Sequence, residues 1–192
     1  MASLSKSIFE KIKFFWAWIQ SPASVASVVP SSMELAAAMI EASEIEPGQR
    51  ILELGPGTGV FTRALLDAGV EERQLVLVEY SPEFSNQLRQ DFPKAQVIEG
   101  DAFLVLKELR QNAERFSAAL SGLPLLMFPE EVREDCIRDC LQILRPGGYF
   151  CQFTYSPTPL VADNEEWEAK VSERIWQNIP PAVVWSYRRN VD

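Results

Sequence analysis

Residues 51–60, Ile-Leu-Glu-Leu-Gly-Pro-Gly-Thr-Gly-Val, impose a more specific backbone geometry than any other stretch of the chain. The first four residues form a short, mostly apolar run, which is typical of a buried strand in a parallel sheet. Glycine then occupies every second position, namely Gly55, Gly57 and Gly59. A helix that begins near Thr58 would direct its unpaired N–H groups and its positive dipole end to the same place. The stretch therefore predicts a strand, a ligand-binding turn and a helix.

The glycine spacing argues against the dinucleotide-binding fingerprint, which needs a third glycine three residues after the second. Position 60 is Val60, and Gly59 follows Gly57 by only two residues. An acidic residue, Glu53, instead precedes the first glycine by two positions. This order resembles the S-adenosylmethionine (SAM) loop of class I methyltransferases. For the loop alone, a Gly/Pro-rich surface turn after a strand is an equal alternative.

Composition narrows the classes of function. The chain has 192 residues, enough for one domain with a sizeable core, and it carries a net charge of −9. Such an acidic chain is a poor electrostatic partner for nucleic acid. It contains no histidine and only three cysteines, which argues against a metal site and predicts reduced thiols in a cytoplasmic protein. No secretory signal is recognisable, and no apolar run is long enough to span a bilayer.

Residues 4–20 are predicted to form an aromatic amphipathic helix, because large apolar residues recur there every three or four positions. Lysines lie on or beside its narrow polar side, a pattern that fits the interface of an anionic membrane. A helix packed on the domain, or an oligomer contact, is the alternative. The residues assigned to membrane or substrate contact are Lys6, Lys11, Lys13, Phe15, Trp16 and Trp18.

From Arg50 onward, strand and helix patterns alternate, which predicts an α/β fold with a mostly parallel sheet and helices on both faces. Strands are expected at 51–54, 75–80, 96–99, 117–121 and 149–154. Helices are expected from Ser31 or Ser32, and over 82–92, 103–110 and 129–144. At the end of the chain, 171–179 and 182–188 predict a hairpin-like pair that adds one antiparallel strand, although 171–177 fits a helix equally well.

Ligands of open α/β sheets bind beyond the carboxyl ends of the strands, so residues at those ends are the candidates for a site. Glu79, followed by Tyr80, ends the second strand, where a carboxylate can accept hydrogen bonds from a ribose diol. Asp101, followed by Ala102, comes after the third strand, where a carboxylate can accept from the amino group of adenine. Each alone is more often a solvated charge, but their order after the glycine loop predicts SAM as the cofactor.

Most of the sequence resembles the bacterial phospholipid N-methyltransferases, a family of class I SAM-dependent enzymes. The resemblance rests on an aromatic N-terminal helix and on the following segments: Ser21-Pro22-x-x-Val25, Val29-Pro30-Ser31-Ser32, Glu53–Gly59, Ser121-Gly122-Leu123-Pro124-Leu125, Gln152-Phe153-Thr154-Tyr155 and Asn178-Ile179-Pro180-Pro181-Ala182. The Ser121–Leu125 segment and the Asn-x-Pro-Pro-Ala segment are more selective than the glycine loop.

The resemblance implies methylation of phosphatidylethanolamine towards phosphatidylcholine, with S-adenosylhomocysteine as the second product. It implies that residues 1–30 form membrane-docking or lid helices on the inner face of the cytoplasmic membrane, and that 31–192 form the methyltransferase domain. The acceptor would lie beside Ser121, Gly122 and Leu123, at the end of the fourth strand. Tyr155, near the end of the fifth strand, is expected to face the acceptor, or to be an ordinary strand-end tyrosine.

Other acceptors and a different class of function stay open at this point. Ribosomal RNA adenine dimethyltransferases place an aromatic residue where this chain has Leu125, so a flipped base would lose its stacking platform. Ornithine lipid or a small-molecule amine is compatible with the same fold. A membrane-associated protein that binds SAM without turnover is the alternative that is not an enzyme.

Overall fold

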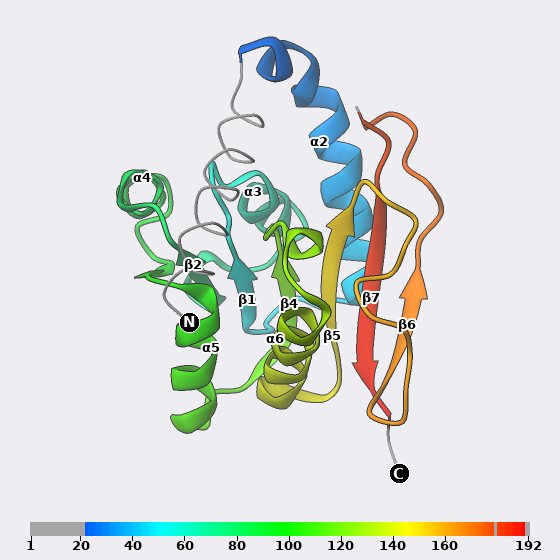
Figure 1. Ribbon diagram of the computed structural model, residues 1–192. Coiled ribbons are helices and arrows are strands. Elements are labelled where there is room, and N and C mark those ends of the chain that lie inside the picture. The colour runs from blue at the N-terminus through cyan, green and yellow to red at the C-terminus, as the bar shows by residue number, and fades with distance from the viewer. Residues whose placement is uncertain (1–21, 179, 191–192) are drawn as a thin grey trace.

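The computed structural model describes residues 22–178 and 180–190, which form a seven-stranded sheet with helices on both faces (Figure 1). The strands are β1 (Ile51–Leu54), β2 (Leu75–Glu79), β3 (Gln96–Glu99), β4 (Phe116–Ser121), β5 (Leu144–Thr154), β6 (Trp167–Val171) and β7 (Val183–Arg189). The helices are α2 (Pro22–Ser43), α3 (Val60–Asp67), α4 (Pro82–Asp91), α5 (Ala102–Gln111) and α6 (Glu130–Ile143), with short 3-10 helices at Glu72–Gln74 and Leu125–Met127.

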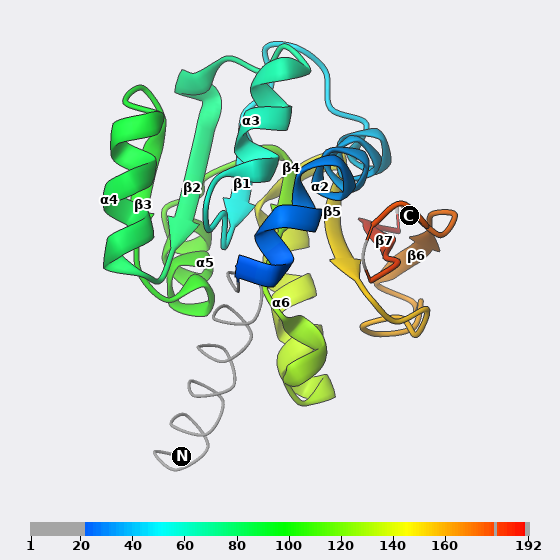
Figure 2. The same cartoon turned by 90° about the horizontal axis from the view of Figure 1, so that it is seen from above.

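The strand order is β3-β2-β1-β4-β5-β7-β6, and among the described strands β7 alone runs in the direction opposite to the others. The parallel sheet and the antiparallel C-terminal strand confirm the predicted fold class. Helices α2, α3 and α4 cover one face, and α5 and α6 cover the other (Figure 2). Side chains of β1 alternate between the two cores: Ile51 faces α2 and α3, whereas Leu52 and Leu54 face α5 and α6.

The register of the central strands brings the predicted site residues to one edge of the sheet. Leu54, the last residue of β1, pairs with Val78 in β2 and with Ser121 in β4. The glycine loop, Glu79 and the residues after Ser121 therefore leave the sheet side by side. This edge is where open α/β sheets bind their ligands.

Most element boundaries differ from the sequence prediction by at most two residues, but three elements differ by more. Strand β5 begins at Leu144 rather than at the predicted 149. Helix α2 begins at Pro22 rather than at Ser31 or Ser32, so Pro30 lies inside it even though proline cannot donate the helical hydrogen bond. The first strand of the C-terminal pair is Trp167–Val171, earlier in the chain than the predicted 171–179, and residues 172–178 form no helix. None of the described helices is long and apolar enough to cross a membrane. The predicted helix over residues 4–20, with its six assigned contact residues, lies outside the described part of the chain.

The loops after β1 and β4 touch through their backbones. The Gly122 N–H donates to the Leu54 carbonyl at 2.8 Å. A Cβ added at Gly122 would lie 2.7 Å from the Gly55 carbonyl oxygen, and one added at Gly55 would lie 2.9 Å from Leu123 Cδ2. Gly55 also has a φ of +68°, which side chains rarely adopt. Glycine at both positions is therefore required for the two loops to approach this closely.

Gly122→Ala is expected to lower the free energy of unfolding by about 1–3 kcal/mol, because the new methyl group must displace a backbone carbonyl. Gly100→Ala is the matched control. Its Cβ would lie 3.1 Å from Val105 Cγ2, the end of a side chain that can shift, and its φ is outside the left-handed region. Urea denaturation of both variants measures the difference. Equal losses for the two would contradict the close backbone contact.

Candidate functional site

The glycine loop begins where β1 ends and leads directly into α3. The Gly55 N–H donates to the Val78 carbonyl of β2 at 2.8 Å, which fixes the start of the loop to the neighbouring strand. Gly57 and Gly59 have φ values of +56° and +78°, in the left-handed region that favours glycine. Gly59 is the N-cap of α3, so the helix begins two residues later than the predicted Thr58.

Two buried glutamates lie under this loop. Glu53, in β1, is fully buried; its Oε2 accepts a hydrogen bond from Thr62 Oγ1 at 2.7 Å, and its Oε1 has no partner. Glu79, at the end of β2, accepts from the Gly57 N–H at 3.0 Å and from the Ser81 N–H at 2.8 Å. Glu79 therefore links the glycine loop to the N-terminus of α4.

The electrostatics of this pair favour a cationic ligand. Burial raises the pKa of Glu53 to about 7 against the opposing effect of the Thr62 hydrogen bond, and the charge of Glu79 adds to the rise. Burial also raises the pKa of Glu79, although its backbone hydrogen bonds oppose the shift. A positive charge beside the two carboxyl groups would stabilise their ionised forms, whereas a pyrophosphate would be repelled. This arrangement is a further argument against a dinucleotide.

Asp101 follows β3 at the same edge of the sheet. Its Oδ1 caps α5 by accepting from the Phe103 N–H at 2.8 Å and, at 3.4 Å, from the Leu104 N–H. The β3 end is held next to the β2 end, because the Gly100 N–H donates to the Glu79 carbonyl at 2.9 Å. Tyr80, the residue after Glu79, is exposed, whereas Ala102 is buried in the core. These positions lie where the sequence predicted the adenosine end of a cofactor.

The loop after β4, residues 121–125, is here called the acceptor loop. Ser121 is fully buried, and its Oγ accepts from the Leu123 N–H at 3.2 Å. Leu125 is buried against the α5–α6 core, while the next residue, Leu126, is partly exposed. Of the three residues predicted beside the acceptor, Gly122 and Leu123 thus pack directly on Gly55 of the glycine loop, and Ser121 pairs with Leu54 at the end of β1.

Tyr155 follows the last residue of β5 and packs on the α2–α3 face. Its ring meets Phe153 edge-on at 5.6 Å between centroids, and Phe153 meets Phe61 of α3 in the same way at 5.6 Å. By strand alternation Ser121 faces the opposite side of the sheet, towards α5 and α6. The structure therefore brings both predicted residues to the same edge but not to the same face. Burial raises the pKa of Tyr155, so its hydroxyl stays protonated at neutral pH.

Sequence reasoning missed two side chains of this region. Thr62 holds the buried carboxyl of Glu53, and Gln152 of β5 donates from Nε2 to the Leu123 carbonyl at 2.9 Å. A weak signal was present for Gln152, since it is a polar residue within the apolar run of β5. No local pattern distinguishes Thr62 from any other threonine in the first turn of a helix.

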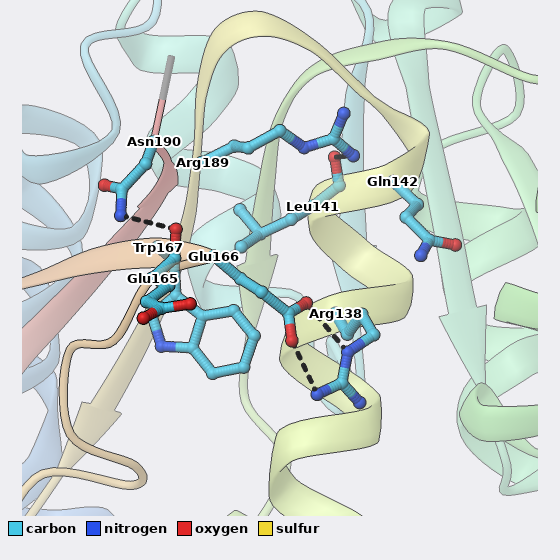
Figure 3. Close-up of a pocket in the computed structure, with 8 residues that line it drawn as sticks. All are labelled: Arg138, Leu141, Gln142, Glu165, Glu166, Trp167, Arg189 and Asn190. Atoms are coloured by element: carbon cyan, nitrogen blue, oxygen red, sulfur yellow. Dashed lines mark hydrogen bonds and ion pairs between the residues drawn. The ribbon is translucent and has the colours of Figure 1, made fainter. Parts of the chain in front are cut away.

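A separate pocket of about 470 Å³ lies at the far edge of the sheet, between α6, the start of β6 and the end of β7 (Figure 3). Three of its charged residues already have partners. Arg138 forms two hydrogen bonds with the Glu166 carboxylate, at 2.9 and 3.1 Å, and Arg189 donates to the Leu141 carbonyl at 3.2 Å. This pocket does not adjoin the glycine loop.

Comparison with known proteins identifies the fold family. A family profile described as a methyltransferase domain matches residues 51–148, from the start of β1 into β5. The chain is also 33% identical over 138 residues to an ornithine lipid N-methyltransferase from Singulisphaera acidiphila, covering 70% of this chain and 72% of that protein.

A second relative, ribosomal RNA small subunit methyltransferase A from Thermosynechococcus vestitus, is 40% identical over 86 residues, which cover 44% of this chain but only 27% of that protein. Among solved structures, Aeropyrum pernix fibrillarin, crystallised with natively bound SAM, has a TM-score of 0.55 at 18% identity. The match covers 81% of this chain and 76% of that chain, and likeness at this level reflects a shared fold.

The residues present fit SAM as the cofactor. The unpartnered Oε1 of Glu53 and the raised pKa of both buried glutamates suit a cationic sulfonium compound. The glycines of the loop carry no side chains, so a ligand can approach the loop backbone closely. Glu79 and Asp101 follow adjacent strands, as an adenosine group requires. Together with the matching family profile, which spans more than half of the sequence, this geometry shows that the chain belongs to the class I SAM-dependent methyltransferases.

Proposed function

We propose that this chain transfers the methyl group of SAM to the amino nitrogen of a membrane lipid. The acceptor loop is the main support, because it sets aliphatic side chains and backbone carbonyls directly against the cofactor loop. The ornithine lipid N-methyltransferase, which is similar over most of both chains, supports an amino lipid as the acceptor.

When bound, SAM would supply a methyl group activated by its sulfonium. A neutral amine that takes up this methyl group as the C–S bond breaks would become an N-methylammonium ion, with S-adenosylhomocysteine as the second product. The protein's contribution to such a displacement is proximity, alignment and exclusion of water. Glu53, the glycine loop and Glu79 would hold the cofactor. The acceptor loop would then bring the nitrogen to the methyl carbon.

The amine must lose a proton before or during the attack, and the chain has no histidine to take it. Tyr155 is a poor base, because burial raises its pKa and keeps the hydroxyl protonated. It remains suited to donating a hydrogen bond or to facing the methylated ammonium with its ring. We therefore assign proton removal to water. Because Tyr155 lies at the same edge of the sheet as Ser121 but on the opposite face, its contact with the acceptor stays a prediction from the sequence.

A nucleic-acid acceptor is disfavoured by the same loop and by the charge of the chain. A flipped base needs a stacking platform beside the methyl donor, and Leu125 offers a buried aliphatic side chain instead. The net charge of −9 opposes approach of a phosphate backbone. The ribosomal RNA methyltransferase relative matches over only 27% of its own length.

Two lipid headgroups are candidates for the acceptor. The resemblance noted in the sequence favours phosphatidylethanolamine, which would be methylated through its mono- and dimethyl derivatives towards phosphatidylcholine. The relative from Singulisphaera acidiphila favours ornithine lipid. Both present an amine at the end of a flexible arm, so the proposed chemistry is the same.

Purified protein with radiolabelled SAM is expected to methylate phosphatidylethanolamine or ornithine lipid, offered in parallel with ribosomal RNA. Thin-layer separation and mass analysis of the lipids identify the headgroup and the number of methyl groups. Glu79→Ala, which removes the acceptor of the Gly57 and Ser81 hydrogen bonds, should lose product in every lane. Product in the RNA lane alone would refute the proposal, and SAM binding without any product would favour a non-catalytic SAM-binding protein.

We further propose that residues 1–30 dock the enzyme on anionic lipid at the inner face of the cytoplasmic membrane. The support is the sequence: residues 4–20 combine tryptophans and phenylalanines with Lys6, Lys11 and Lys13, in a chain that is acidic elsewhere. Aromatic side chains and lysines favour the headgroup region of such a membrane. The lipid headgroup would then reach the acceptor loop from the membrane side.

Deleting residues 1–20 is expected to abolish sedimentation with anionic vesicles and to reduce lipid methylation to background, while the dissociation constant for SAM stays within about threefold. A second, full-length variant tests how much the lysines contribute to membrane binding. It carries Lys6→Glu, Lys11→Glu and Lys13→Glu, and it should lose binding to anionic vesicles. Undiminished vesicle binding by the deletion variant would rule out this anchor.

The affinity for SAM should rise with pH because of Glu53. Its pKa in the folded protein is raised to about 7, so below that pH the carboxyl is mostly protonated and must release a proton when a cation binds. Isothermal calorimetry should show roughly tenfold tighter binding at pH 8 than at pH 6. Glu53→Gln cannot ionise, so its affinity should be weaker at pH 8 and nearly independent of pH.

The same shift predicts how the stability of the ligand-free protein depends on pH. A raised carboxyl pKa stabilises the fold below the unfolded value of 4.5, and this contribution is lost as the pH rises through about 7. The thermal midpoint of the wild type should therefore fall between pH 5 and pH 8 more than that of Glu53→Gln. Parallel profiles for the two proteins would show that Glu53 does not titrate in this range.

A further inference from the structure

Two buried polar atoms without hydrogen-bond partners lie on the α5–α6 side of the sheet, on neighbouring strands. Within the described residues, Gln152 Oε1 in β5 and Trp185 Nε1 in β7 are both in this state. Gln152 and Trp185 are direct partners in the antiparallel ladder, so their side chains project to the same face. A buried carboxamide oxygen without a donor is costly, and such atoms concentrate at functional sites.

The carboxamide of Gln152 lies against the acceptor loop. Gln152 pairs in register with Ser121, the last residue of β4, and is only 1% exposed. Its Nε2 donates to the Leu123 carbonyl at 2.9 Å and to the Phe153 carbonyl at 2.8 Å. The backbone N–H of the same residue, Leu123, donates to Ser121 Oγ. Gln152 and Ser121 together hold Leu123 at the point where the acceptor would meet the donor methyl.

We propose that Gln152 binds the acceptor nitrogen, with Oε1 accepting a hydrogen bond from an N–H of the lipid amine. This inference rests on the proposed function and names the residue that would orient the nitrogen in it. The donor missing from Oε1 then arrives with the substrate. A neutral oxygen acceptor suits the reaction, because it holds the N–H while the nitrogen lone pair points at the methyl carbon.

The proposal makes the contribution of Gln152 depend on the methylation state of the acceptor. Each methyl group added to the nitrogen replaces one N–H, and a neutral tertiary amine has no N–H left to donate. Gln152 should therefore assist the primary and secondary amines but not the tertiary amine. A residue that only supports the fold of the acceptor loop would affect all three alike.

A purely structural explanation also exists for the two unpartnered atoms. Trp185 Nε1–H is a donor directly opposite Gln152, so a small rotation would join the indole to Oε1 without any ligand. The two explanations predict different effects of a double substitution on the free energy of unfolding. A direct bond would couple the two residues in stability, whereas a substrate-binding role would leave their effects on unfolding additive.

The experiment compares full-length wild type, Gln152→Leu and Gln152→Glu on one lipid in its unmethylated, monomethyl and dimethyl forms, in mixed micelles with saturating SAM. The lipid is the headgroup that the wild type methylates fastest. Gln152→Leu should lose roughly 10- to 100-fold in kcat/KM on the primary amine, the effect of one lost hydrogen bond, and change little on the tertiary amine. Gln152→Glu retains an acceptor oxygen and should preserve more of the primary-amine activity.

The ratio of the primary to the tertiary rate is measured within each preparation, so partial unfolding of a variant does not affect it. Gln111→Leu, at an exposed position near the end of α5, is the matched control and should keep the wild-type ratio. A proportional loss on all three forms, or coupling between Gln152→Leu and Trp185→Phe in denaturation, would overturn the assignment. A wild type that methylates none of these lipids would instead refute the proposed function itself.

Discussion

The close approach of two backbones, at Gly55 and Gly122, is the constraint on which the rest of the site depends. With a side chain at either position, the loop after β1 and the loop after β4 would be forced apart. The first of these loops is proposed to surround the cofactor, and the second to present the acceptor. A displacement reaction is sensitive to the distance between its reacting atoms, so this contact sets the geometry of the transfer before any substrate binds.

Two buried carboxyl groups distinguish the side of the site where we expect the cofactor. Glu53 and Glu79 lie at the ends of neighbouring strands, and each is held by donors that orient it: Thr62 for the first, Gly57 and Ser81 for the second. Burying two acidic groups so close together raises their proton affinity. The fold maintains this unfavourable arrangement because a cationic ligand relieves it.

Much of this organisation was predictable from local sequence patterns. The alternation of strands and helices predicted the parallel sheet, and the Glu53–Gly59 pattern predicted the glycine turn between β1 and α3, because strand periodicity and glycine backbone preferences are local properties. Helix α2 was predicted to start too late, since Pro30 normally ends or begins a helix. Thr62 and Gln152 escaped prediction because their partners are distant: Gln152 meets Leu123 across the β4–β5 ladder, a contact that only the register defines.

The acidic environment of Glu53 and Glu79 also bears on what happens after the reaction. Methyl transfer converts a sulfonium into a neutral thioether, so the charge that relieved the two carboxyl groups disappears in a single step. The spent cofactor therefore loses an electrostatic attraction that the fresh one has. If the proposed site is correct, the burial that favours binding of SAM would also favour release of S-adenosylhomocysteine after each transfer.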